Sequence, residues 1–87
     1  MKKILMFTME SCPYCVKARR WMGEVLKENP QYQAIEISYV DELEEPDLAD
    51  TYDYWYVPTY YVDGVKVHEG AASKEIVQRV FKSAFEG

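Results

Sequence analysis

The stretch that decides the fold is residues 7–15, Phe-Thr-Met-Glu-Ser-Cys-Pro-Tyr-Cys, in which two residues separate Cys12 from Cys15. Residues 3–8, which lead into this stretch and include its first two positions, are apolar, β-branched or aromatic and predict a buried strand. Residues 13–29, which begin at the last three positions of the stretch, have helical periodicity. Pro13 suits a first helical turn because its missing N–H would have no partner there. The two cysteines are therefore expected where a strand passes into a helix.

The rest of the chain divides into further strands and helices. Strands are predicted over residues 32–38, 59–62 and 65–68, a short helix from Pro46, and a last amphipathic helix from Ser73 to Glu86. Asp63-Gly64 is a strong hairpin signal, because both central positions of a type I′ turn need positive φ. Ser73 is a good N-cap. The order βαβαββα predicts an α/β fold, a mixed four-stranded sheet with three helices that cover both faces.

Composition and charge exclude several classes of protein. The chain has 87 residues, which suits one domain over residues 1–87, and a net charge of −5. This charge disfavours binding to nucleic acid or to an anionic membrane, since both require clustered cations. The apolar run at residues 4–6 is too short for a signal peptide or a membrane span. We therefore expect a cytoplasmic monomer.

The cysteine pair is predicted to be reactive rather than structural. A reducing cytoplasm seldom keeps a static disulfide, and a bridge that closes so short a loop would stabilise little. A zinc site needs four ligands, and beyond Cys12 and Cys15 the chain offers only His68, so no metal is expected. A Cys-x-x-Cys motif within a βαβ pattern is typical of redox proteins.

The helix start is expected to give the two cysteines different roles. Unpaired backbone N–H groups and the positive end of the helix dipole stabilise a thiolate at Cys12, and the thiolate is the attacking species. Cys15 lies within the first turn and can resolve a mixed disulfide on Cys12. The sequence leaves open whether Lys17, Arg19 or Arg20 points toward the thiolate.

Two segments give the chain a family resemblance. Residues 7–15 resemble the active-site segment of dithiol glutaredoxins, in which Cys-Pro-Tyr-Cys is the usual motif. Residues 57–59, Val-Pro-Thr, resemble the family's second signature, a cis-proline loop that faces the cysteines. Gly70 lies where the family has a glycine turn. The resemblance extends over essentially the whole chain and implies the thioredoxin fold.

The resemblance also implies roles for particular residues. Cys12 and Cys15 would be the catalytic dithiol. The backbone of Val57 would pair with a substrate strand or with the cysteine part of glutathione. Contacts with the substrate are implied for Pro13, Tyr14, Val57, Pro58, Gly70 and Ala71.

Two departures from the family concern glutathione. Met9 stands where glutaredoxins usually have a lysine that holds a glutathione carboxylate. Residues 70–73 read Gly-Ala-Ala-Ser, where the family usually has Gly-Gly and then acidic residues. Backbone N–H groups at the start of the last helix could still bind a carboxylate. We expect glutathione as a co-substrate, disulfide-containing proteins as partners and no tightly bound cofactor.

Three alternatives stay open at this point. A thioredoxin-like electron donor reduced by a flavoprotein reductase is favoured by Met9 and opposed by the Cys-Pro-Tyr-Cys motif. A dimer that shares an iron–sulfur cluster would use cysteine as a ligand. A redox-inert interaction module would never form a reversible disulfide.

Aromatic residues gather on both sides of Pro58. Strand alternation predicts that Tyr60 packs against helices while its neighbour Tyr61 lies half exposed. Tyr14 and Tyr56, close to the two motifs, either face a substrate or belong to the ordinary surface.

Overall fold

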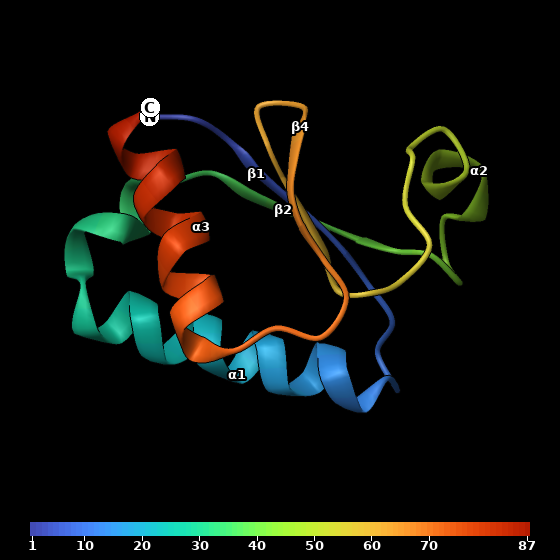
Figure 1. Ribbon diagram of the computed structural model, residues 1–87, viewed down its shortest axis with the longest axis horizontal. Coiled ribbons are helices and arrows are strands. Elements are labelled where there is room, and N and C mark those ends of the chain that lie inside the picture. The colour runs from blue at the N-terminus through green and yellow to red at the C-terminus, as the bar shows by residue number, and fades with distance from the viewer.

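Four strands and three α-helices form the fold of the computed structural model, which describes residues 1–87 (Figure 1). The strands are β1 (Ile4–Thr8), β2 (Ile37–Asp41), β3 (Thr59–Val62) and β4 (Val65–Glu69). The helices are α1 (Pro13–Glu28), α2 (Pro46–Ala49) and α3 (Lys74–Glu86), and a 3-10 helix, η1 (Pro30–Ala34), follows α1. The predicted α/β architecture with a thioredoxin fold is confirmed.

The strands lie in the order β2-β1-β3-β4. β1 and β2 run parallel, as a β-α-β crossover requires, whereas β3 is antiparallel to both β1 and β4. The β3–β4 hairpin turns at Asp63 (φ 49°) and Gly64 (φ 80°), so the predicted positive φ at both positions is confirmed.

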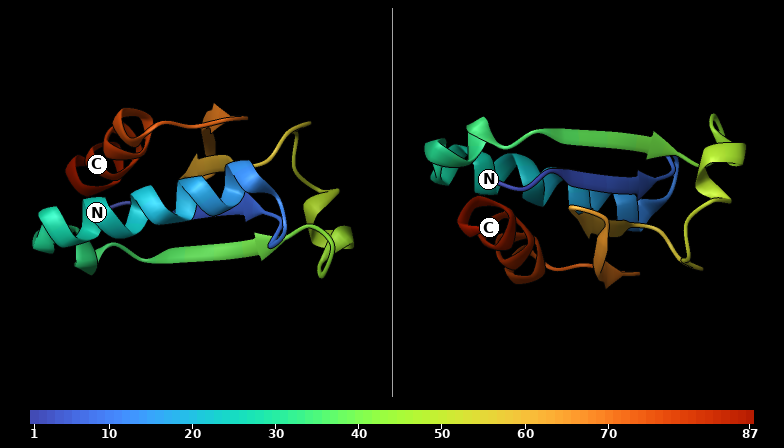
Figure 2. Two further views of the ribbon diagram at one scale, coloured as in Figure 1. Left: turned by 90° about the horizontal axis from the view of Figure 1, so that it is seen from below. Right: turned by 90° about the horizontal axis from the view of Figure 1, so that it is seen from above.

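One face of the sheet is covered by α1 and α3, which lie side by side (Figure 2). Its core consists of apolar side chains from the sheet, the two helices and the segment between α1 and β2: Ile4, Met6, Ala18, Met22, Val25, Ile35, Tyr60, Val62, Val77, Val80, Phe81 and Ala84. The Lys2 N–H donates to the Ala84 carbonyl (2.7 Å), which holds the two termini together. None of the helices is both long enough and apolar enough to cross a membrane.

The opposite face carries a smaller core beside α2. Phe7 is fully buried there, and its ring lies 4.8 Å from that of Tyr52 and 4.6 Å from that of Tyr54. Tyr60 packs on the helical face as predicted, but the prediction that Tyr61 is half exposed is wrong. Tyr61 is buried because Tyr52 packs edge-on against its ring.

The second strand is present, but its predicted bounds, residues 32–38, are wrong. Pro30 begins η1, and the strand starts only at Ile37, where β2 can pair with Ile4 of β1. Tyr32 stacks on Phe81 of α3 with the ring centroids 5.9 Å apart. This contact with α3 favours a helical turn over the extended backbone that the alternating sequence pattern suggested.

Candidate active site

The two cysteines lie at the junction between β1 and α1. Cys12 is the N-cap residue of α1 and is partly exposed, with Pro13 as the first helical residue. Cys15 is in the first turn and has no exposed surface. Both are free thiols. The predicted contrast between an accessible Cys12 and a buried Cys15 is therefore present.

The surroundings of Cys12 favour its thiolate. A hydrogen bond from the Cys15 backbone N–H is the main cause that lowers the pKa of Cys12, and the Tyr14 N–H adds to it. The Cys15 thiol and the charge of Arg19 lower the pKa further, while partial burial acts in the opposite direction. The N–H groups of the first helical turn thus do what the position of the motif predicts.

Cys15 is in the opposite situation. Burial raises the pKa of its thiol. The hydroxyl of Thr8 and the backbone N–H of Met9 partly offset this effect, and Met9 N lies 3.4 Å from Cys15 Sγ. Cys15 is therefore held as a neutral thiol until its proton is removed.

The loop before Cys12 is fixed from both sides. The Glu10 carbonyl accepts a hydrogen bond from Arg19 Nη2 (3.2 Å), and its N–H donates to Asp41 Oδ2 (3.1 Å). Arg19 Nη1 also donates to Thr8 Oγ1 (2.6 Å). Among the basic residues that the sequence left unassigned, Arg19 is the one whose charge acts on Cys12.

The Val57–Pro58 segment lies at the same end of the sheet as the cysteines. Thr59 pairs with Phe7 in the antiparallel register, so the residues just before β3 lie beside those just after β1. The Val57–Pro58 peptide bond is cis. The backbone N–H and carbonyl of Val57 form no hydrogen bond within the chain. They remain available to another chain.

Gly70 and Ala71 adjoin this segment. The Gly70 N–H donates to the Pro58 carbonyl (2.8 Å), and Gly70 has a positive φ of 94°. Ala71 is exposed, and its carbonyl lies 3.0 Å from His68 Nε2. The Gly70 N–H is thus already used inside the protein, which leaves Gly70 with a supporting role for the Pro58 loop.

Large aromatic side chains near the two motifs are exposed. The exposed fraction is 57% for Tyr14, 86% for Trp55 and 70% for Tyr56. The carboxylate of Glu69 accepts hydrogen bonds from the backbone N–H groups of Trp55 and Tyr56. The end of β4 therefore fixes the backbone that carries both exposed rings.

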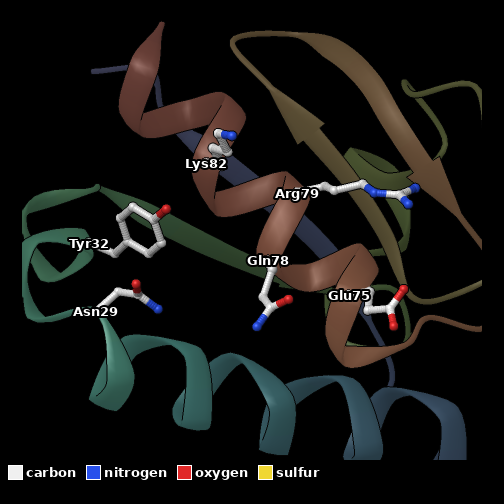
Figure 3. A pocket seen from close by; sticks show the side chains of 6 residues that line it. All are labelled: Asn29, Tyr32, Glu75, Gln78, Arg79 and Lys82. Carbon is white, nitrogen blue, oxygen red and sulfur yellow. The ribbon is translucent and has the colours of Figure 1, made fainter.

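An acidic hollow lies beside the loop that precedes Cys12. It has a volume of about 520 Å³ and is lined by Glu10, Ser11, Asp41, Leu43 and Glu44. A second hollow, of about 390 Å³, is lined by Asn29, Tyr32, Glu75, Gln78, Arg79 and Lys82 (Figure 3). Asn29 follows the far end of α1 from Cys12, whereas the acidic hollow includes Glu10 and Ser11, the two residues before Cys12.

The sequence analysis placed Cys12, Pro13, Tyr14 and Cys15 on one helix start, and the structure adds Thr8, Arg19 and Asp41 to the site. The sequence contains signals from which Thr8 and Arg19 could have been predicted. Thr8 follows Met6 on the same face of β1. Arg19 lies four residues after Cys15 on one face of α1. Asp41 could not be found without the register that pairs it with Thr8.

Comparisons of sequence find related redox proteins. The profile of the thioredoxin domain matches residues 2–82. The chain is 36% identical over 80 residues to a thioredoxin of Methanocaldococcus jannaschii, which covers 92% of each chain. It is 32% identical over 65 residues to glutaredoxin 1 of Rickettsia felis, which covers 74% of this chain and 61% of that protein.

Comparisons of structure give the same fold. Oxidised thioredoxin from Plasmodium falciparum superposes with a TM-score of 0.72 at 20% identity, over 94% of this chain and 79% of that one. An uncharacterised thioredoxin-like protein from Clostridium perfringens gives a TM-score of 0.70 at 28% identity, over 97% of this chain and 71% of that one.

Proposed function

This chain belongs to the thioredoxin domain family, and on that basis we propose that it is a thiol–disulfide oxidoreductase that reduces protein disulfides through Cys12 and Cys15. The observation that carries the proposal is the contrast between the two thiols. The pKa of Cys12 is lowered at a helix start, whereas the pKa of Cys15, one turn further on, is raised by burial.

The reaction has two steps. The Cys12 thiolate attacks one sulfur of a substrate disulfide, a bond forms between the two, and the other substrate sulfur leaves as a thiolate. Cys15 then loses its proton and attacks Cys12 Sγ. The Cys12–Cys15 disulfide forms, and the remaining substrate sulfur leaves as the second thiolate. The substrate gains two electrons and the two cysteines lose them.

The substrate would lie along Val57. An extended segment that contains the disulfide can pair with the free N–H and carbonyl of Val57 in the manner of an added strand. The exposed rings of Tyr14 and Tyr56 can pack against the side chains of that segment. Pro13 and Ala71 are exposed and can extend this surface. The predicted contact of Pro58 with the substrate is not available to its side chain, which is fully buried, and Gly70 supports the Pro58 loop.

A flavoprotein reductase is the electron donor that the surroundings of Cys12 favour. Glutathione carries carboxylates, but Met9 offers them no cation, and three acidic side chains line the hollow beside the loop that precedes Cys12. Arg19 is already bound to Thr8 and to the Glu10 carbonyl. Glutathione is the second candidate, supported by the Cys-Pro-Tyr-Cys motif and by the similarity to glutaredoxin 1.

The test is reduction of insulin disulfides with dithiothreitol as the chemical reductant, for the wild type, Cys12→Ser and Cys15→Ser. We expect catalysis by the wild type and none above the uncatalysed rate by Cys12→Ser. Full activity of Cys12→Ser would refute the assigned roles, and inactive wild-type protein would refute the function.

A second assay identifies the donor. Dithiothreitol is replaced either by glutathione with glutathione reductase and NADPH, or by a thioredoxin-type flavoprotein reductase with NADPH. Turnover with the flavoprotein reductase alone is expected. Turnover with the glutathione system, and none with the flavoprotein reductase, would show that glutathione is the donor.

A further inference from the structure

Thr8 lies between the buried cysteine and a guanidinium group. Alternation along β1 directs Ile4, Met6 and Thr8 to the face that α1 covers. On α1, Cys15 and Arg19 are four residues apart and share the side that faces β1. The last side chain of the strand therefore meets the first two turns of the helix at this point.

The contacts of Thr8 define the direction of its hydroxyl proton. Thr8 Oγ1 accepts a hydrogen bond of 2.6 Å from Arg19 Nη1. A hydroxyl has a single proton to donate, and an arginine can only donate, so the Thr8 proton is free for another acceptor. The Cys15 sulfur is the nearby candidate, since its Sγ lies 3.4 Å from the backbone N of Met9, the residue after Thr8. The Thr8 hydroxyl also opposes the effect of burial on the pKa of the Cys15 thiol.

We propose that Thr8 and Arg19 act together as positioning residues for the second step of disulfide exchange: Arg19 holds the Thr8 hydroxyl so that it donates to the Cys15 sulfur. This inference rests on the proposed function and concerns only the step in which Cys15 attacks. A hydrogen bond whose donor is itself polarised by a cation stabilises negative charge best. The Cys15 thiolate exists only as it attacks, so the pair stabilises it at that moment.

No other charged or titratable group replaces Thr8 in this role. Cys12 faces Cys15 from the helix start and, as a thiolate, opposes its ionisation. Tyr60 faces it from β3, but burial raises the pKa of Tyr60 so that its hydroxyl stays neutral, and that hydroxyl has no hydrogen-bond partner. Arg19 acts on Cys15 through Thr8, and Tyr39 lies near Arg19 rather than near the thiol.

The two steps can be timed separately with dipyridyl disulfide, which releases an ultraviolet-absorbing thiopyridone at each attack. The first release is the attack by Cys12, and its rate rises with the probe concentration. The second is the attack by Cys15, and its rate does not depend on the probe concentration. Cys15→Ser removes the second release and so identifies it.

Thr8→Val keeps the β-branched shape and removes the hydroxyl. We expect the second release to be about threefold slower at pH 7, because each unit of rise in the pKa of Cys15 lowers its thiolate fraction tenfold while the more basic thiolate regains part of the rate. Its pH profile should move to higher pH. The first release should keep its rate. Thr8→Ser, which retains the hydroxyl, should restore the second release.

Arg19→Lys tests the same pair without altering the strand. Lysine keeps the charge near Cys12 but cannot donate to Thr8 and to the Glu10 carbonyl as a fork. The second release should slow by a larger factor than the first, which Arg19 also supports through the Glu10 carbonyl. The matched control Arg20→Gln, an exposed neighbour on α1, should affect neither.

Two results would overturn the inference: a second release with wild-type rate and pH profile in both Thr8→Val and Arg19→Lys, or both releases slowed equally with no rescue by Thr8→Ser. A wild-type protein that shows no second release would instead refute the proposed function.

Discussion

Cys12 and Cys15 are one helical turn apart, but their side chains meet opposite conditions. Cys12 receives backbone N–H groups from the helix start and lies near the charge of Arg19. Cys15 is fully buried beneath the same turn. A spacing of three residues on a helix is thus enough to separate an accessible thiol with a lowered pKa from a buried thiol with a raised pKa.

Iodoacetamide should therefore modify Cys12 in preference to Cys15. Only a thiolate is alkylated, and the pKa of Cys12 is lowered while that of Cys15 is raised, so at pH 7 Cys12 should be labelled faster than Cys15. Peptide mapping by mass spectrometry after brief labelling of the reduced protein measures both rates. Labelling of both cysteines at the same rate in the native protein would contradict the assignment.

At the scale of elements, the sequence predicted those whose signals are local. The Cys-Pro-Tyr-Cys helix start, the Asp63-Gly64 turn and the Ser73 N-cap, whose hydroxyl accepts from the Ile76 N–H (3.2 Å), all depend on neighbouring residues. The segment at residues 32–38 could not be predicted, because its form depends on packing against α3.

The candidate site also combines residues that could be predicted from local sequence with residues that could not. Cys12 and Cys15 follow from their spacing and from the strand and helix around them. Asp41 looked like part of a solvated acidic run, yet its carboxylate binds the Glu10 N–H across the parallel β1–β2 pair. Contacts that depend on strand register cannot be read from one segment alone.

The hairpin and the aromatic loop are joined by Glu69, and this link should depend on pH. Hydrogen bonds from Lys66 and from the Trp55 N–H lower the pKa of Glu69 from 4.5 to about 2. A depressed carboxylate pKa stabilises the fold above pH 4.5, and this contribution is lost as the pH falls through about 2. Glu69→Gln should therefore be less stable than the wild type at pH 7, and the difference should shrink below pH 4.5.

Urea denaturation over a series of pH values measures this difference in the free energy of unfolding. Glu86→Gln, an exposed residue at the end of α3, is the control for loss of one negative charge. A difference for Glu69→Gln that stays constant from pH 7 to pH 2, or one that Glu86→Gln reproduces, would show that the Glu69 contacts do not stabilise the fold.

At the scale of the whole molecule, the chain is acidic, and part of this charge lies close to the loop that leads to Cys12. The net charge is −5, and Glu10, Asp41 and Glu44 line a hollow beside that loop. Charges of one sign around a cleft raise the rate at which oppositely charged molecules arrive. The protein should therefore meet cationic disulfides faster than anionic ones.

Rates of attack on cystamine, hydroxyethyl disulfide and dithiodiglycolate, which are cationic, neutral and anionic at pH 7, measure this preference. After division by the rates of a free thiol with the same compounds, cystamine should react about tenfold faster than dithiodiglycolate at low salt. The ratio should fall toward one as salt is added, since salt screens exposed charges. A ratio that salt leaves unchanged would mean that the acidic surroundings have no effect on the encounter.

The most direct test of the central claim is to trap the mixed disulfide. Reduced Cys15→Ser is mixed with a disulfide-containing peptide, quenched with acid and mapped by mass spectrometry, with Cys12→Ser treated in parallel. The account predicts that the peptide is attached to Cys12 in Cys15→Ser and that Cys12→Ser forms no adduct, because its remaining thiol is buried and neutral. An adduct on Cys15 in Cys12→Ser that forms as fast as the one on Cys12 would contradict it.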